Sequence, residues 1–145
     1  MELVVVAQQL NLHYLKYESS KEGHNMRVLV IDDNKDIAEM VRLCLESQED
    51  ITCNVVSDGK AGLQSIREDT FDVILLDLAM PEFSGFDIFK ALKDKDMLKS
   101  QNILIFTASS VTDTEVQEML ASGARGVLRK PLSIDDLIGT VERFR

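Results

Sequence analysis

Five short apolar runs alternate with segments of helical periodicity, and this alternation limits the chain to few folds. The runs are rich in Val, Ile and Leu and span residues 28–31, 51–56, 73–76, 103–106 and, more weakly, 126–128. Nearly continuous apolar runs of this length are typical of strands that are covered on both faces. Strands that alternate with helices pair in parallel. We therefore predict an α/β protein with a five-stranded parallel sheet and helices on both faces.

The segments between the runs carry two kinds of helix signal. Apolar residues recur at spacings of three and four in five segments, most clearly in residues 134–144. Thr112 and Glu115 have the spacing of a capping box, in which the hydroxyl and the carboxylate accept hydrogen bonds from free amides. Asp58 and Ser133 are expected to cap the second and fifth helices.

Composition excludes several classes of protein. A chain of 145 residues with 45% hydrophobic side chains suits one domain with a sizeable core and is not disordered. Its net charge of -9 argues against non-specific nucleic-acid binding, which needs a basic surface. No apolar run approaches the roughly 20 residues of a membrane-spanning helix. Cys44 and Cys53 lie in apolar stretches without metal-ligand spacing, so we predict buried free thiols.

The first 25 residues differ from the rest. Residues 18–25 are polar and resemble a linker, whereas residues 3–17 show the spacing of a short amphipathic helix. A weakly packed extension and a true translation start at Met26 remain alternatives. With two lysines against three glutamates, this segment holds one of the nine excess negative charges, so the acidity belongs to residues 26–145. We expect a domain at 26–145 and, without a basic leader, a cytoplasmic location.

Polar side chains follow four of the predicted strands. Asp32 and Asp33 follow the first strand, Asp77 the third, Thr107 the fourth and Lys130 the fifth. Either Asp32 or Asp33 alone is compatible with capping the first helix. Together, three carboxylates and one ammonium at the carboxyl edge of a parallel sheet leave a formal charge of -2 in one crevice. That excess favours a bound cation, and an all-oxygen ligand set suits Mg²⁺.

These residues and their order resemble the receiver domain of two-component response regulators, of the stand-alone, CheY-like type. The resemblance covers residues 26–145 and depends on Asp32-Asp33, on Asp77-Leu78-Ala79-Met80-Pro81 followed by Gly85, on Thr107-Ala108 and on Lys130-Pro131. It implies a flavodoxin-like (βα)5 fold with strand order 2-1-3-4-5.

The resemblance also implies a role for each polar residue around the phosphoryl group. Asp77 would accept the group as an acyl phosphate, which makes the chain a signalling phosphoacceptor rather than an enzyme. Lys130 would pair with a phosphoryl oxygen, and Thr107 would donate a hydrogen bond to it. The peptide bond between Lys130 and Pro131 would be cis.

The same resemblance implies the ligands of the cation. Asp33 would bind Mg²⁺ directly and Asp32 mainly through water. Asp77 and the backbone carbonyl of Ala79 would complete the ligands from the protein.

The sequence departs from the family at Val127, where an aromatic residue usually takes part in signalling. We therefore expect a signal carried by the loop after Thr107, the fourth helix and the fifth strand. A receiver-like module that signals without phosphorylation remains an alternative. An FMN-binding protein is disfavoured because Asp32-Asp33-Asn34 would repel phosphate, and a haloacid dehalogenase-type phosphatase would need an aspartate at Ala79.

The end of the chain at Arg145 leads to expectations about partners. A stand-alone receiver would take its phosphoryl group from a sensor histidine kinase or a phosphotransfer protein and would dock on a target protein. We expect no direct contact with nucleic acid and no membrane insertion. A homodimer through the fourth helix, fifth strand and fifth helix is compatible with the sequence.

Overall fold

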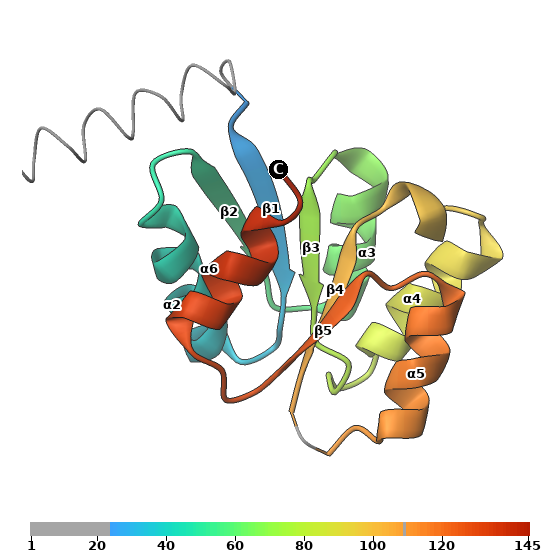
Figure 1. Ribbon diagram of the computed structural model, residues 1–145. Helices are drawn as coiled ribbons and strands as arrows, with labels where there is room; N and C mark the ends of the chain where they lie inside the picture. The colour runs from blue at the N-terminus through green and yellow to red at the C-terminus, as the bar shows by residue number, and fades with distance from the viewer. Residues whose placement is uncertain (1–23, 109) are drawn as a thin grey trace, which may run out of the picture.

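The computed structural model describes residues 24–108 and 110–145, which form one parallel sheet flanked by helices (Figure 1). The elements are β1 (Met26–Ile31), α2 (Lys35–Glu46), β2 (Ile51–Val56), α3 (Gly59–Glu68), β3 (Val73–Leu76), α4 (Gly85–Asp94), the 3-10 helix η1 (Leu98–Ser100), β4 (Ile103–Thr107), α5 (Asp113–Ser122), β5 (Gly126–Arg129) and α6 (Ile134–Glu142). The strand order is β2-β1-β3-β4-β5. The predicted fold class and strand order are confirmed.

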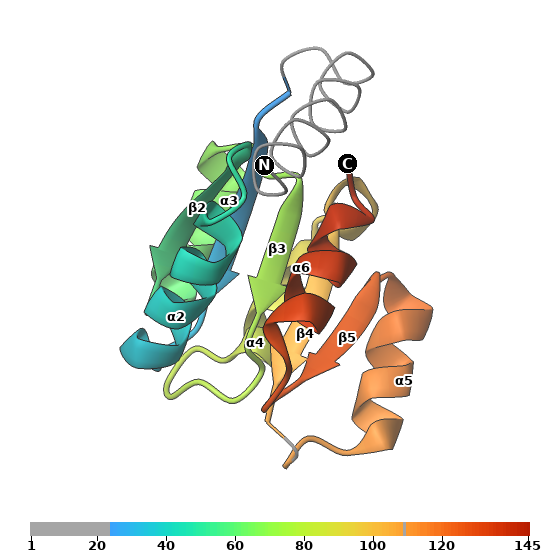
Figure 2. The same ribbon diagram turned by 60° about the vertical axis from the view of Figure 1, so that its left-hand side comes forward.

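Two helical layers enclose the sheet, as Figures 1 and 2 show from two directions. Helices α2 and α6 cover one face, where Val30, Leu45 and Phe106 belong to one core cluster. Helices α3, α4 and α5 cover the other face, where Leu76 and Ile105 belong to a second cluster. Successive strand residues thus enter opposite cores, as the pleat requires. All strands end at the same edge of the sheet.

The strands β2 and β3 have the predicted bounds, whereas β1, β4 and β5 extend slightly beyond the predicted ones. β1 begins at Met26, whose amide donates to the carbonyl of Asp50 at 2.8 Å. β5 continues to Arg129, which pairs with Thr107 of β4. The central position of β1, between β2 and β3, gives its first residues partners that its own sequence does not reveal.

The predicted caps are present. The Thr112 hydroxyl accepts from the Glu115 amide at 3.2 Å, and the Glu115 carboxylate accepts from the Thr112 amide at 2.9 Å. Asp58 and Ser133 cap α3 and α6 through their side chains. Each cap stabilises a helix start by roughly 1 kcal/mol and places the preceding loop at the carboxyl edge of the sheet.

The predicted burial of the two thiols is confirmed for Cys53 and only partly for Cys44, which is half-buried. Burial raises the pKa of the Cys53 thiol to about 12. The expected amphipathic helix in residues 3–17 lies outside the described residues. No helix in the described part of the chain combines the length and apolar character that crossing a membrane requires.

Candidate functional site

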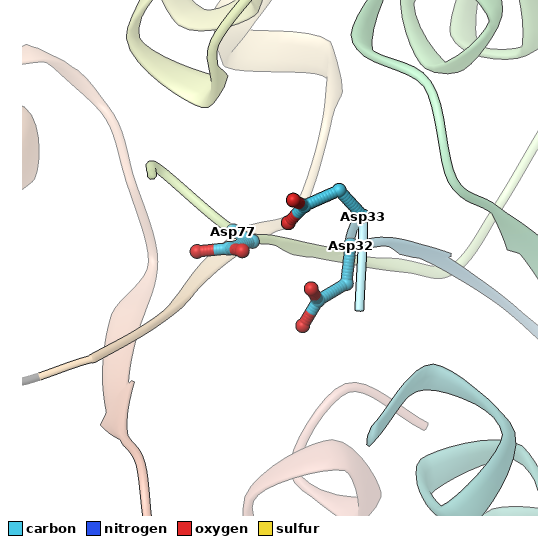
Figure 3. Close-up of side chains that lie close together, drawn as sticks. All are labelled: Asp32, Asp33 and Asp77. Carbon is cyan, nitrogen blue, oxygen red and sulfur yellow. The ribbon is translucent and has the colours of Figure 1, made fainter. Parts of the chain in front are cut away.

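Three carboxylates meet at the carboxyl edge of the sheet. Asp32 and Asp33 follow β1 and Asp77 follows β3, and the Asp77 amide donates to the carbonyl of Ile31 at 2.9 Å. Each of the three can offer one oxygen such that these atoms all lie within 4.8 Å of one another. Figure 3 shows the three side chains around a common space. Asp32 and Asp77 are buried, whereas Asp33 is exposed.

Both oxygens of Asp32 have partners. Oδ1 accepts from the amide of Asn34 at 2.9 Å, and Oδ2 accepts from Nζ of Lys130 at 2.5 Å. Asn34 is itself the N-cap of α2, since its side chain accepts from the Ile37 amide at 3.2 Å. The alternative that Asp32 or Asp33 caps this helix is therefore wrong, because Asn34 is the N-cap.

Lys130 links the fifth strand to this carboxylate cluster. Its amide donates to the Thr107 carbonyl at 2.8 Å, and its Nζ lies 3.6 Å from Oδ2 of Asp77. The ammonium also lies 4.7 Å from the centroid of the Phe106 ring, a cation–π contact. The peptide bond between Lys130 and Pro131 is cis, as expected. A single cation thus contacts two carboxylates and an aromatic face, with 15% of its side chain exposed.

The hydroxyl of Thr107 is buried without a hydrogen bond. Thr107 ends β4 and is fully buried, and among the residues that the structure describes none pairs with its Oγ1. Leaving a buried hydroxyl unpaired costs about 1–3 kcal/mol. A group that arrives at this edge of the sheet and accepts a hydrogen bond would recover that free energy.

The pKa of the Asp77 carboxyl lies well above its ordinary value. Burial, followed by the negative charge of Asp32, raises its pKa to about 6. The charge of Lys130 and the Ala79 amide, which donates to Asp77 Oδ1 at 3.2 Å, oppose this rise. Folding therefore holds this carboxylate in an environment that disfavours its ionised form unless more positive charge arrives.

Replacing Asp77 by asparagine is expected to stabilise the protein in chelator-containing buffer at neutral pH. Because folding favours the protonated carboxyl, the stability that Asp77 contributes is greatest below its ordinary pKa of 3.8 and falls as pH rises through about 6. The gain in free energy of unfolding should be about 1–3 kcal/mol near pH 7 and small near pH 4. Urea denaturation of both proteins measures it, and equal gains at the two pH values would contradict this assignment.

The loop after Asp77 is fixed by a helix cap and a close backbone contact. Ser84 and Asp87 form a capping box at the start of α4, with bonds of 3.2 and 2.8 Å. Gly85 then packs so tightly that a Cβ at this position would lie 2.0 Å from the Asp77 carbonyl oxygen. The glycine of the predicted motif is therefore required by the approach of α4 to the backbone of Asp77.

The geometry allows a comparison with known proteins. A sequence model of the response regulator receiver domain matches residues 28–142. This chain belongs to that family. The resemblance to a receiver domain, drawn from the strand-end residues, is thereby confirmed, whereas the stand-alone type stays a prediction.

Curated relatives extend well beyond the part that this receiver matches. The response regulator ArlR of Staphylococcus saprophyticus is 31% identical over 115 residues, which are 79% of this chain and 50% of the relative. The DNA-binding response regulator MtrA of Mycobacterium leprae is 33% identical over 116 residues, 79% of this chain and 49% of the relative. The receiver thus spans about half the length of the curated relatives it matches.

Solved receiver structures share the fold. The receiver domain of Francisella response regulator 1452 is 35% identical, with a TM-score of 0.73, over 83% of this chain and 96% of that one. The chemotaxis protein CheY4 of Vibrio cholerae is 31% identical, with a TM-score of 0.72, over 83% and 98% of the respective chains.

The site also contains residues that the sequence reasoning missed. The spacing of Ser84 and Asp87 is that of the capping box recognised at Thr112 and therefore gave a usable signal. Phe106 gave none, because its contact with Lys130 joins neighbouring strands rather than nearby positions in the chain.

Proposed function

We propose that this receiver accepts a phosphoryl group on Asp77 from a phosphohistidine donor. The observation that carries the proposal is the unpaired, buried Thr107 hydroxyl at the edge where Lys130 faces Asp77. The hydroxyl of Thr107 lacks an acceptor among the described residues, and the ammonium of Lys130 lies within reach of Asp77 while it pairs with Asp32. A phosphoryl group on Asp77 would supply acceptor oxygens for both.

The proposed transfer uses the chain's own groups in defined roles. A lone pair of an Asp77 carboxylate oxygen forms the O–P bond, while the P–N bond of the donor breaks and its electron pair leaves with the imidazole nitrogen. Lys130 moves its charge from Asp32 toward a phosphoryl oxygen. Thr107 donates its hydrogen bond to the group once it is attached.

The three carboxylates fit a hard divalent cation. We propose that Asp33 and Asp77 bind Mg²⁺ directly, Asp32 through water, and the carbonyl of Ala79 as a fourth ligand. All are oxygen donors, and one cation would balance the negative charge that raises the pKa of Asp77. When bound, the ion would neutralise charge on the transferring group.

We propose that phosphorylation changes the conformation of the segment after β4, of helix α5 and of β5. Thr107 ends β4, and its β5 neighbour Arg129 lies beside it in the sheet. Val127 is half-buried and packs against the core under α5, so an aliphatic side chain occupies the position of the usual aromatic. A change at Thr107 would therefore reach α5 through backbone and packing rather than through ring rotation.

The partners follow from this chemistry. We propose that this receiver is cytoplasmic. Its donor would be a sensor histidine kinase or a phosphotransfer protein, and its target a protein that binds the side formed by α5 and β5. The proposed domain spans residues 26–145 and includes the matched region. A homodimer on the same side remains a proposal. So does the absence of direct contact between this domain and nucleic acid, since relatives include DNA-binding regulators.

Intact mass after incubation with acetyl phosphate and Mg²⁺ tests the proposal. We expect one phosphoryl adduct on the wild type and none on Asp77→Asn. The matched control is Asp94→Asn, which removes an exposed carboxylate at the far end of α4 and should leave the adduct unchanged. An equal adduct on Asp77→Asn, or none on the wild type, would overturn the proposed function.

A further inference from the structure

The guanidinium of Arg129 ties the fifth strand to the start of α5. Its Nη1 donates to the carbonyl of Val111 at 3.0 Å, and its Nη2 donates to Oδ1 of Asp113 at 2.7 Å. Val111 lies in residues 110–112, which we call the pre-α5 segment, and Asp113 is the first residue of α5. One side chain therefore holds two consecutive parts of the chain against β5.

The position of Arg129 connects this tie to the phosphoryl-binding groups. Arg129 pairs with Thr107 across β4 and β5, and it directly precedes Lys130, whose amide donates to the Thr107 carbonyl. Because successive side chains along an extended chain point to opposite faces, the side chains of Arg129 and Lys130 point in opposite directions. Lys130 contacts Asp32 and Asp77, whereas Arg129 contacts the pre-α5 segment.

Apolar packing complements the polar tie. The Val111 side chain is buried in the same core cluster as Val116 of α5, and Val127 of β5 packs against that cluster. An aliphatic side chain at Val127 offers no hydrogen bond to the pre-α5 segment. The directional contact between β5 and this segment comes from Arg129.

The ion pair between Arg129 and Asp113 is weak enough to break and form again. Arg129 is about one-third exposed and the Asp113 carboxylate is 95% exposed, so this ion pair contributes roughly 0.2–1 kcal/mol. A hydrogen bond between Thr107 and a charged phosphoryl oxygen is worth about 1.5–3 kcal/mol. The second interaction is large enough to break the first.

The order of the strands gives the direction of movement. β4 lies between β3, which carries Asp77, and β5, which carries Arg129. A Thr107 side chain drawn toward a group on Asp77 moves toward β3 and away from β5. Because the pre-α5 segment follows Thr107 closely in the chain, the same movement stretches the contacts of Arg129.

We propose that Arg129 is a positioning residue that holds the pre-α5 segment against β5 until Asp77 is modified. The inference rests on the proposed phosphoryl acceptor function. The tie favours the unmodified arrangement and is released when Thr107 turns toward the phosphoryl group. Part of the free energy gained when the phosphoryl group binds Thr107 is therefore needed to break the contacts of Arg129 before α5 can shift.

Titration with beryllofluoride, a phosphoryl mimic formed from BeCl₂ and NaF, tests this role in the full chain with Mg²⁺. Arg129→Met should bind the mimic about two- to fivefold more tightly than the wild type, as expected for losing a tie of this strength. Asp113→Asn should change affinity in the same direction by less, because its amide oxygen still accepts a hydrogen bond. Arg125→Met, which removes an exposed guanidinium just before β5, should bind like the wild type.

Amide NMR spectra without the mimic provide a second measurement. In Arg129→Met, signals of residues 110–122 should lie part of the way toward their mimic-bound positions, and Arg129→Lys should lie closer to the wild type. A residue with a merely structural role would instead weaken binding and lower the unfolding temperature.

The outcomes separate the two proposals. Unchanged or weaker binding by folded Arg129→Met, beside a wild type that binds through Asp77, would overturn the role of Arg129 alone. A wild type that binds the mimic no better than Asp77→Asn would overturn the proposed function itself.

Discussion

Replacing Lys130 by methionine is expected to slow phosphorylation of Asp77 by acetyl phosphate about a hundredfold, the usual cost of losing one preorganised group that stabilises developing charge. Methionine keeps an unbranched apolar side chain of similar size, whereas the charge and its cation–π contact with Phe106 are lost. The charge of Lys130 also opposes the rise in the pKa of Asp77, so less of the carboxyl would be ionised at neutral pH. A time course of intact mass measures the rate.

The same substitution should strengthen binding of Mg²⁺ in the absence of a phosphoryl donor. Lys130 pairs with Asp32 at 2.5 Å and so competes with a cation for that carboxylate. Without it, three carboxylates remain uncompensated, and we expect about tenfold tighter binding in a calorimetric titration. Tighter binding of the ion together with slower transfer separates this effect from general misfolding.

Lys99→Met is the matched control for both measurements. Lys99 lies exposed in η1, on a different part of the chain from the carboxylate edge. Its rate of phosphorylation and its affinity for Mg²⁺ should equal those of the wild type. A Lys130→Met protein that reacts at the wild-type rate would contradict the proposed role of the ammonium.

The sequence was sufficient to predict which residues meet at the site because parallel strands impose a common edge. Asp32, Asp77 and Lys130 each follow a strand and Thr107 ends one, so predicting that they lie at one edge required only the strands and their direction. The strand order came from the resemblance to receivers. Local signals such as the capping box at Thr112 were readable because both partners lie within one turn.

Contacts between distant elements were not predictable in this way. The pairing of Lys130 with Asp32 joins residues 98 positions apart, and the tie from Arg129 to Asp113 depends on strand register and rotamers. Asn34 rather than Asp32 caps α2 because the helix begins at Lys35, directly after Asn34. Neither spacing nor composition encodes these choices, since each depends on which side chain packing leaves within reach.

Replacing Gly85 by alanine is expected to lower the free energy of unfolding by about 3 kcal/mol, the upper part of the range for overpacking a close contact. The added Cβ would lie 2.0 Å from the Asp77 carbonyl oxygen and 2.7 Å from the Leu78 Cα. Both are backbone atoms, so relief requires α4 or the end of β3 to move. Urea denaturation followed by circular dichroism measures the loss.

Gly139→Ala provides a control in which the same methyl group has the opposite effect. Gly139 lies exposed within α6, and a Cβ there would meet no atom within 4 Å. Removing the flexibility of a helical glycine should raise the free energy of unfolding by about 0.5–1 kcal/mol. Phosphorylation should be unchanged in Gly139→Ala and reduced in Gly85→Ala, because the displaced backbone carries Asp77. A Gly85→Ala protein as stable and reactive as the wild type would show that α4 can retreat without disturbing Asp77, and the close approach would then have no role in holding the site.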